Sequence, residues 1–327
     1  YTPGVARVCL AIQKDPAMAR EYTAIHNTVA IVTNGTAILG LGDIGPVAGM
    51  PVMEGKAALM ASLGSLNAVP ILVESRDPDR LVDVVAALAP SFGAIQLEDS
   101  AAPECFEIER RLQEKLSIPV LHDDQHGTAV VALAAVRNAG RMVDQRLSQS
   151  VVGQIGLGAA GIGISRLLLA RGVETVLGAD LNPAARDRLK SLGGEPAELD
   201  ELLARADIVI ATTGVPGLIR PEQVRPGQVI LALSNPDPEI EPRDALKAGA
   251  AFAADGKSIN NVLGFPGLFR GALDAGATAF TDEMLVAAAE AIGDLAAVGD
   301  LVPDPLDPAV HEAVAAAVRA AAEQGRQ

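Results

Sequence analysis

Two acidic pairs, Glu98-Asp99 and Asp123-Asp124, each stand where a short apolar run typical of a β-strand stops. Between them, residues 103–116 carry apolar side chains at helical spacing, with a proline near the first helical position. Strand, helix and strand form a crossover unit, so the strands are expected to be parallel, with their carboxyl ends at one edge of a sheet. Open α/β sheets bind ligands at that edge. The pattern predicts an α/β protein with up to four carboxylates in one crevice, a cluster that repels itself unless a cation binds there.

The alternation of predicted strands and helices continues in two halves and ends in a helical tail. We expect an N-terminal α/β substrate and metal domain at residues 1–126 and a Rossmann-type, doubly wound parallel sheet at residues 127–282. Residues 283–327 are expected to form Ala-rich helices that pack back on the first domain. In the first half we predict a loop over 46–55 and a helix over 56–63. A strongly apolar helix is predicted from Thr128 to about Asn138, with Gly140 as its stop.

A glycine-rich turn marks the second half. Residues 156–161, Gly-Leu-Gly-Ala-Ala-Gly, lie between a predicted strand over 151–155 and a predicted helix over 162–170, as the dinucleotide fingerprint requires. Gly156 is expected to make the tight turn, Gly158 to let the backbone approach a pyrophosphate, and Gly161 to bring helix and strand together. Ala159 and Ala160 complete this cofactor-binding turn.

The choice between NAD and NADP depends on residues after this turn. The next predicted strand, 173–179, ends in Asp180, roughly 20 residues after the fingerprint, where an acid suits the 2′-hydroxyl of NAD and opposes the 2′-phosphate of NADP. Arg186 and Arg188 stand nearby and could meet a phosphate, so NADP stays open. Further cofactor contacts are predicted in the loops after the next two strands, at Thr212, Thr213, Gly214 and Asn235.

The residue types narrow the chemistry. Hard carboxylate oxygens select Mg²⁺ or Mn²⁺ over zinc. Hydride transfer to a nicotinamide needs an alcohol, and a metal chelated by a 2-hydroxy acid polarises that oxygen. The β-keto acid formed by such an oxidation loses CO₂ readily, because the same metal stabilises the enolate.

Six segments in order along essentially the whole chain carry a more specific pattern. They are Tyr1-Thr2-Pro3-Gly4-Val5-Ala6, Gly40-Leu41-Gly42-Asp43-Ile44-Gly45-Pro46, Pro51-Val52-Met53-Glu54-Gly55-Lys56, Leu97-Glu98-Asp99, His122-Asp123-Asp124-Gln125-His126-Gly127-Thr128 and Asn260-Asn261-Val262-Leu263-Gly264-Phe265-Pro266-Gly267. In these segments the chain resembles malic enzymes of the shorter bacterial type.

The resemblance implies a role for each site residue. Glu98, Asp99 and Asp124 would be the metal ligands. Lys56 would be the general base on the malate 2-hydroxyl, Tyr1 the acid that protonates the enolate, and Asp123 the residue that holds and tunes Lys56. The substrate contacts would be Asn235, Asn260 and Asn261. Since a lysine of ordinary pKa is protonated at pH 7, burial or a nearby cation must depress the pKa of Lys56.

The chain also departs from the family pattern. The arginine that grips malate in larger eukaryotic members has no counterpart at Thr36-Ala37, and the loop after Asp180 is short, so cofactor preference carries over poorly. His122 and His126 flank the metal acids and are expected to be supporting residues rather than ligands. The family position of Tyr1 lies inside a longer N-terminus, so the first domain is expected to be N-terminally incomplete.

We therefore predict a cytoplasmic, homodimeric malic enzyme that prefers NAD and converts malate to pyruvate and CO₂. A malolactic-type decarboxylase that retains its NAD is an alternative. A catalytically silent dinucleotide-sensing module is another, against which the intact Lys56, Asp123 and metal acids argue. The net charge of −15 disfavours nucleic acid or an anionic membrane as partner, and no apolar run reaches the roughly 18 residues of a membrane span. Two cysteines exclude a disulfide framework.

Overall fold

The computed structural model describes residues 1–38 and 40–325. Its first half contains a parallel four-stranded sheet in the order β2-β1-β3-β4. The strands are β1 (Thr28–Thr33), β2 (Asn67–Leu72), β3 (Ala94–Glu98) and β4 (Val120–His122). Because side chains alternate along β1, Ala30 and Val32 pack against α4 (Pro78–Leu88) and α5 (Glu104–Lys115) on one face. Val29 and Ile31 pack toward α3 (Met50–Gly64) and α6 (Asp123–Met142) on the other.

Two helices begin earlier than the sequence pattern indicates. Residues 50–55, predicted as loop, form the first turns of α3, which Pro51 can enter because the first helical positions need no amide hydrogen. The helix predicted from Thr128 begins at Asp123 and runs through Gly127 and Gly140 to Met142. Glycine lowers helix propensity, but tertiary packing decides here, since most of α6 is buried. A Cβ on Gly127 would collide with the Asp123 carboxylate, and one on Gly140 with the Gln145 carbonyl.

The second sheet has six parallel strands in the order β10-β9-β8-β5-β6-β7. This doubly wound order confirms the Rossmann prediction. The strands are β5 (Val151–Ile155), β6 (Thr175–Ala179), β7 (Glu195–Pro196), β8 (Ile208–Ala211), β9 (Val229–Ala232) and β10 (Phe252–Asp255). The helices between them are α7 (Ala159–Ala170), α8 (Pro183–Ser191), α9 (Leu199–Arg205) and α10 (Pro242–Lys247).

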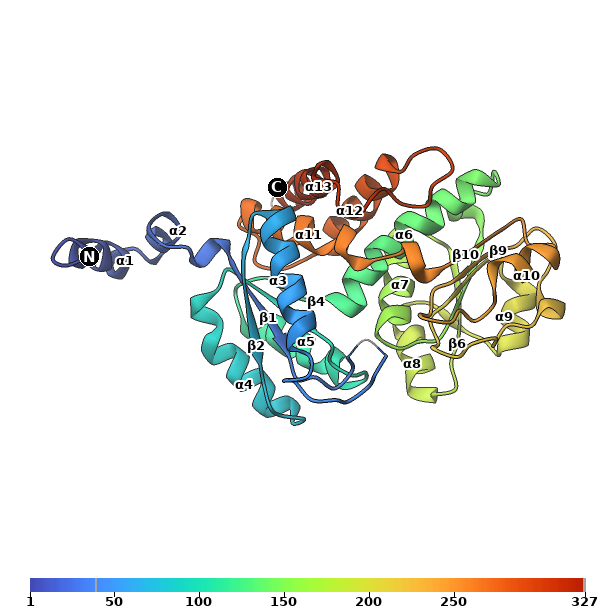
Figure 1. Ribbon diagram of the computed structural model, residues 1–327, viewed down its shortest axis with the longest axis horizontal. Helices are drawn as coiled ribbons and strands as arrows, with labels where there is room; N and C mark the ends of the chain where they lie inside the picture. The colour runs from blue at the N-terminus through green and yellow to red at the C-terminus, as the bar shows by residue number, and fades with distance from the viewer. Residues whose placement is uncertain (39, 326–327) are drawn as a thin grey trace.

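Three helices close the chain: α11 (Phe265–Ala275), α12 (Asp282–Leu295) and α13 (Pro308–Gln324). Helix α13 lies against α11 and α12, α11 also contacts α3, and α12 packs on α6 and α7 (Figure 1). The domain limits at 126 and 282 stay a prediction. The first falls inside α6, and the second coincides with the start of α12.

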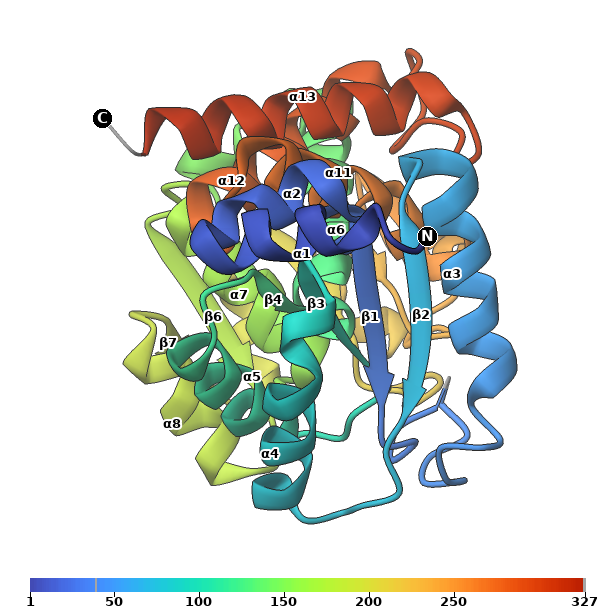
Figure 2. The ribbon, with the colours of Figure 1, turned by 90° about the vertical axis from the view of Figure 1, so that its left-hand side faces the viewer.

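The first 24 residues form an N-terminal arm that points away from the rest of the molecule (Figure 1) and toward the viewer in Figure 2. It carries α1 (Val5–Lys14) and α2 (Ala19–Tyr22), and neither helix has a buried residue. Val5 and Leu10 expose apolar side chains to solvent. At the base of the arm, the Arg20 guanidinium donates a hydrogen bond to the Leu273 carbonyl over 3.1 Å.

Among the described residues, no helix combines the length and apolar character that a membrane crossing requires.

Candidate active site

A cluster of carboxylates lies where β3 ends and α6 begins. Glu98 and Asp99 lie at the end of β3, and Asp124 lies in the first turn of α6, where the helix dipole favours acids. One oxygen of each lies within 4.8 Å of the others. Burial raises the pKa of Glu98 well above its usual range, Lys56 opposes that rise, and the neighbouring carboxylates Asp124, Asp123 and Asp99 add to it. The cluster therefore fits a hard divalent cation, which would relieve the repulsion among these three oxygen donors.

Lys56 joins this cluster from α3. It lies at helical spacing with Met53 and Met60, so it belongs to the buried stripe of the helix. Its ammonium lies 2.5 Å from Asp123 Oδ2 and 3.2 Å from Glu98 Oε1, and 4.5 Å from the centre of the Phe265 ring. Burial alone lowers the pKa of Lys56, but the carboxylates of Asp123 and Glu98 outweigh it and raise the pKa. Without further positive charge, the lysine is therefore held protonated, which is opposite to the state of a base.

The amide of Asn261 extends this network, since its Nδ2 donates to Asp123 Oδ2 over 2.9 Å. Asn235, Asn260 and Asn261 line one cavity of about 360 Å³. Thr128 of α6 and Thr212 after β8 line the same cavity. The three predicted substrate residues thus line the same cavity as Ala160 and Thr212, which were predicted to contact the cofactor, and Asn261 connects this cavity to Asp123.

Glu109 is a buried carboxylate that sequence reasoning missed, and it contacts residues on both sides of Asp123 and Asp124 in the sequence. Glu109 of α5 accepts a 2.8 Å hydrogen bond from the His122 amide and a 3.1 Å bond from Gln125, and lies 3.0 Å from His126 Nε2. Burial raises the pKa of Glu109, but His126 and His122 outweigh it and lower the pKa. His122 Nε2 lies 3.2 Å from Asp124 Oδ2, as expected of a supporting residue. The sequence does contain a signal for Glu109, because this acid lies on the apolar face of its helix.

The glycine-rich turn has the geometry that each of its glycines was expected to provide. Gly156 has φ +85°, and a Cβ there would lie 2.7 Å from the Thr212 carbonyl. A Cβ on Gly161 would collide with the Gly156 carbonyl, so helix α7 can approach the turn only with glycine at that position. Gly158 has open space instead, which leaves its backbone accessible to a ligand. Ala159 and Ala160 form the first turn of α7.

A cavity of about 410 Å³ adjoins this turn and is lined by Gly156, Gly158, Asp180, Glu198 and Thr213. Asp180 accepts hydrogen bonds from the amides of Leu157 (2.7 Å) and Asn182 (2.8 Å), so its carboxylate is fixed at the rim of the turn.

Both arginines that left NADP open already have partners. Arg186 pairs with Glu198 at 2.8 Å, and the Arg188 guanidinium lies 4.2 Å from the centre of the Phe106 ring of α5.

The loops after β8 and β9 are joined by Glu239, which sequence reasoning also missed. This fully buried carboxylate accepts from the Thr213 amide (2.6 Å), the Thr213 hydroxyl (2.8 Å) and the Ser234 hydroxyl (2.5 Å). The Gly214 amide donates to Ser234 Oγ over 2.8 Å. Nothing in the local pattern marks Glu239, because its partner Thr213 lies 26 residues earlier in the chain.

Tyr1 is a predicted catalytic residue that does not lie near Lys56 and Asp123 of the same chain. Its side chain is fully exposed, and it lies at the tip of the N-terminal arm, away from the body that holds Lys56 (Figure 1). The physical reason is that helix α1 has no buried residue, so nothing in the same chain folds the arm back over the acids.

The chain matches known families along most of its length. Residues 1–78 match the malic enzyme N-terminal domain, and residues 183–326 match the malic enzyme NAD binding domain. Residues 122–216 match the NAD binding domain of D-isomer specific 2-hydroxyacid dehydrogenases.

Individual relatives agree. The chain is 60% identical to NAD-dependent malic enzyme 1 of Bacillus subtilis over 323 residues, covering 98% of this chain and 74% of that protein. It is 42% identical to the bifunctional malic/malolactic enzyme of the same organism, covering 99% of this chain and 86% of that one. The crystal structure of malic enzyme from Pyrococcus horikoshii superposes with a TM-score of 0.93 at 41% identity, covering 100% of this chain and 83% of that one. On these matches, this chain belongs to the malic enzyme family.

Proposed function

We propose that this chain is an NAD-dependent oxidoreductase that converts malate to pyruvate and CO₂, with Mn²⁺ or Mg²⁺ held by Glu98, Asp99 and Asp124. The observation that carries the proposal is the contact of Lys56 with both Asp123 and Glu98. One proton-transfer group thereby touches the carboxylate cluster on one side and the asparagine-lined cavity, through Asp123 and Asn261, on the other.

Lys56 would take the proton from the malate 2-hydroxyl. For that step the amine must be neutral, whereas the carboxylates around it favour the ammonium form. A bound divalent cation would supply the missing positive charge and polarise the hydroxyl oxygen. It would also compete with the ammonium for the carboxylates that hold the lysine protonated. Asp123 keeps Nζ in place before and after the transfer, and Asn261 fixes the Asp123 oxygen that Lys56 contacts.

The cavity lined by Asn235, Asn260 and Asn261 would hold the substrate. Amide nitrogens donate to carboxylate oxygens without adding charge. Among the described residues that line this cavity none is an arginine, which agrees with the lack of an arginine at Thr36-Ala37. Neutral donors together with the metal would therefore bind a dianion that larger family members grip with a guanidinium.

The cofactor would be NAD rather than NADP. Two carboxylates, Asp180 and Glu198, line the cavity beside the glycine-rich turn. Because Arg186 balances the charge of Glu198, the negative charge that a 2′-phosphate would face is that of Asp180. Arg186 is paired with one of those carboxylates and Arg188 lies on Phe106, so neither is free to receive the phosphate without losing its contact.

The proton donor to the enolate would be Tyr1, acting in a homodimer. Since the arm leaves Tyr1 far from Lys56 of its own chain, we infer that Tyr1 completes the site of a second copy. Helix α1 exposes Val5 and Leu10, and covering such apolar side chains on the second copy would offset the cost of ordering the arm. Homodimerisation, like a cytoplasmic location, remains a prediction.

A spectrophotometric assay of the chain with malate tests the function. NAD and NADP are compared with Mn²⁺ and with Mg²⁺, and pyruvate and lactate are quantified. We expect NADH and pyruvate in equal amounts. Absence of turnover under all four conditions, with the chain folded and NAD bound, would favour the sensing module instead.

A malolactic activity is the second candidate, because the chain is 42% identical to a bifunctional malic/malolactic enzyme. Lactate formed from malate without net reduction of NAD would identify it. In that case the pairing of Lys56 with Asp123 would serve the same proton transfer, and the difference would lie in retention of the cofactor.

A further inference from the structure

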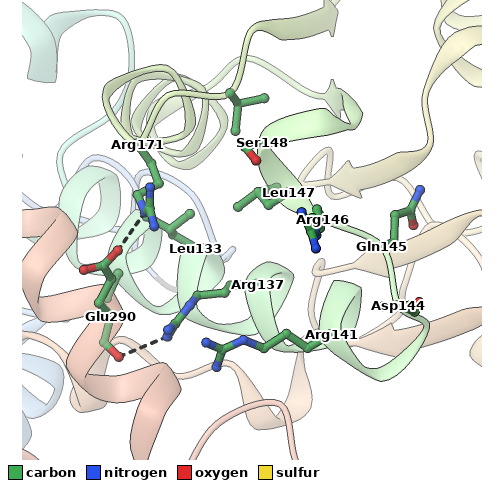
Figure 3. A pocket seen from close by; sticks show the side chains of 12 residues that line it. Leu133, Arg137, Arg141, Asp144, Gln145, Arg146, Leu147, Ser148, Arg171 and Glu290 are labelled. Atoms are coloured by element: carbon green, nitrogen blue, oxygen red, sulfur yellow. Dashed lines mark hydrogen bonds and ion pairs between the residues drawn. The ribbon is translucent and has the colours of Figure 1, made fainter.

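A cavity of about 370 Å³ lies at the opposite end of α6 from the acid cluster. It is bounded by the last turns of α6, the segment 144–148, the residues that follow α7, and α12 (Figure 3). Arg141 lies seventeen positions after Asp124 on one helix, so the two sites are about 25 Å apart along α6. The cavity is therefore separate from the site described above.

Four arginines and no lysine are among the twelve residues that line this cavity: Arg137, Arg141, Arg146 and Arg171. This is unusual for a chain with 26 basic and 41 acidic residues. Figure 3 shows the Arg137 and Arg171 side chains extending toward Glu290. The rest of the lining includes the apolar side chains of Leu133, Val173 and Ala289.

The arginines are only partly neutralised. Arg171 Nε lies 2.7 Å from Glu290 Oε1, and Arg137 Nη2 lies 2.7 Å from Asp294 Oδ1, which Arg141 shares at 3.5 Å. Across the part of the chain that the structure describes, no carboxylate pairs with Arg146. Even with Asp144 counted, the four guanidinium groups outnumber the carboxylates around them, and each guanidinium has five N–H donors.

We propose that this cavity binds a compact dianion, a phosphate or a dicarboxylate, through Arg137, Arg141, Arg146 and Arg171. Planar guanidinium groups from separate elements suit the oxygens of both chemistries, because each can form paired N–H···O bonds. The hydroxyl of Ser148 lines the same space and adds a neutral donor. A bound dianion would connect α6, the segment 144–148, Arg171 after α7 and α12.

The competing explanation is that these arginines only stabilise helix ends. Arg141 lies in the last turn of α6 and Arg171 caps α7, where cations interact favourably with the helix dipole. Arg146 distinguishes the two explanations, because it lies outside both helices and forms no ion pair with any residue that the structure describes. Its substitution should therefore leave the fold intact and affect the ligand alone.

Isothermal titration calorimetry on the full chain tests the proposal, with inorganic phosphate, pyrophosphate and succinate each titrated at an ionic strength fixed with chloride. The test variant is Arg146→Glu, with Arg146→Gln as a milder change. Arg80→Glu is the matched control, since Arg80 is an exposed arginine of α4 outside the cavity. Circular dichroism and the melting temperature check that each variant folds.

We expect saturable binding of at least one probe, weakened at least tenfold by Arg146→Glu, less by Arg146→Gln, and less than twofold by Arg80→Glu. The probe that binds tightest identifies the source as phosphate or dicarboxylate. Equal affinities in the Arg146 and Arg80 variants, or no saturable binding of any probe, would overturn the proposal. So would a signal from succinate alone that survives Arg146→Glu, since succinate then binds elsewhere.

Discussion

The acid cluster and the glycine-rich turn are built by opposite means. At the cluster, the carboxylates of Glu98, Asp99 and Asp124 are crowded, and burial and the neighbouring acids raise the pKa of Glu98 although Lys56 opposes the rise. At the turn, Gly156 and Gly161 lie so close to backbone carbonyls that a side chain would not fit, and the turn adopts this shape without a ligand. One region is organised by charge and the other by the absence of side chains, so substitutions should affect them differently.

Asp124→Asn should have the largest effect. A neutral amide is a weaker ligand than a carboxylate, and it also loses the charge beside His122, so turnover at ordinary Mn²⁺ should be abolished. Thermal melting measured with and without Mn²⁺ and NAD separates the regions. The stabilisation by Mn²⁺, about 2.7 kcal/mol at a hundredfold excess over Kd in the native chain, should disappear while that by NAD remains. Retained turnover would remove Asp124 from the ligand set.

Lys56→Ala comes next, with an expected loss in kcat of about 10²–10⁴-fold, as for one acid–base group. Removal of the ammonium also leaves Asp123 and Glu98 without their cation, so the variant should bind Mn²⁺ more tightly. Steady-state kinetics and calorimetry measure both quantities. Lys115→Ala, on the exposed surface of α5, is the control that should change neither. A kcat within tenfold of the native chain would contradict the assignment.

Tyr1→Phe should lower malate turnover about 10²-fold, the lower end for one proton-transfer group. Proton exchange at C3 of pyruvate should fall equally, since both reactions need a donor at that carbon. Mixing Tyr1→Phe chains with Lys56→Ala chains tests whether the arm serves a second copy. Each mixed dimer has one of its two sites intact. Because half of the dimers in an equimolar, randomly paired mixture are mixed, the mixture should recover up to about a quarter of the native activity. Recovery of nothing, in a mixture shown to exchange chains, would place Tyr1 outside the partner's site.

Gly161→Ala should act on the turn alone. The added methyl collides with the Gly156 carbonyl, and overpacking of this kind costs about 1–3 kcal/mol, or roughly 5- to 150-fold in NAD affinity. Mn²⁺ binding should stay at the native value. Gly4→Ala is the control, because a Cβ at Gly4 meets open space and the φ of Gly4 is ordinary. Gly172→Ala is less suitable, because the φ of Gly172 is +92° and any side chain there is strained. An unchanged Kd for NAD would show that the turn tolerates side chains.

Asp180→Ser should have the smallest effect, confined to cofactor choice. The native chain is expected to have a kcat/KM for NAD at least about tenfold above that for NADP, since a mispaired charge in a partly buried site costs about 2 kcal/mol. Serine removes the charge near the 2′-position and should narrow this ratio. Equal use of both cofactors by the native chain would mean that Arg186 leaves Glu198 for the phosphate.

Much of the fold and of the site was predictable because both are encoded locally. Apolar runs mark the strands, and the residues at their carboxyl ends, such as Glu98 and Asp180, are placed by the parallel topology. The start of α6 was not predictable, since Gly127 argues against a helix until one sees that a Cβ would displace Asp123. Glu239 escaped because its contact with Thr213 joins two loops that lie 26 residues apart in the chain. No local pattern shows where Tyr1 lies, because its side chain is exposed and helix α1 has no buried residue.

Helix α6 carries Asp123 and Asp124 in its first turn, and its middle is built from small residues against α7 and α12. Ala132, Ala135 and Ala139 are entirely buried, so a larger side chain at any of them would move the helix as a whole. A genetic screen for loss of function in this chain should therefore recover many lesions at these alanines. Such variants would lose activity as active-site mutants do, although the altered atom never approaches the substrate.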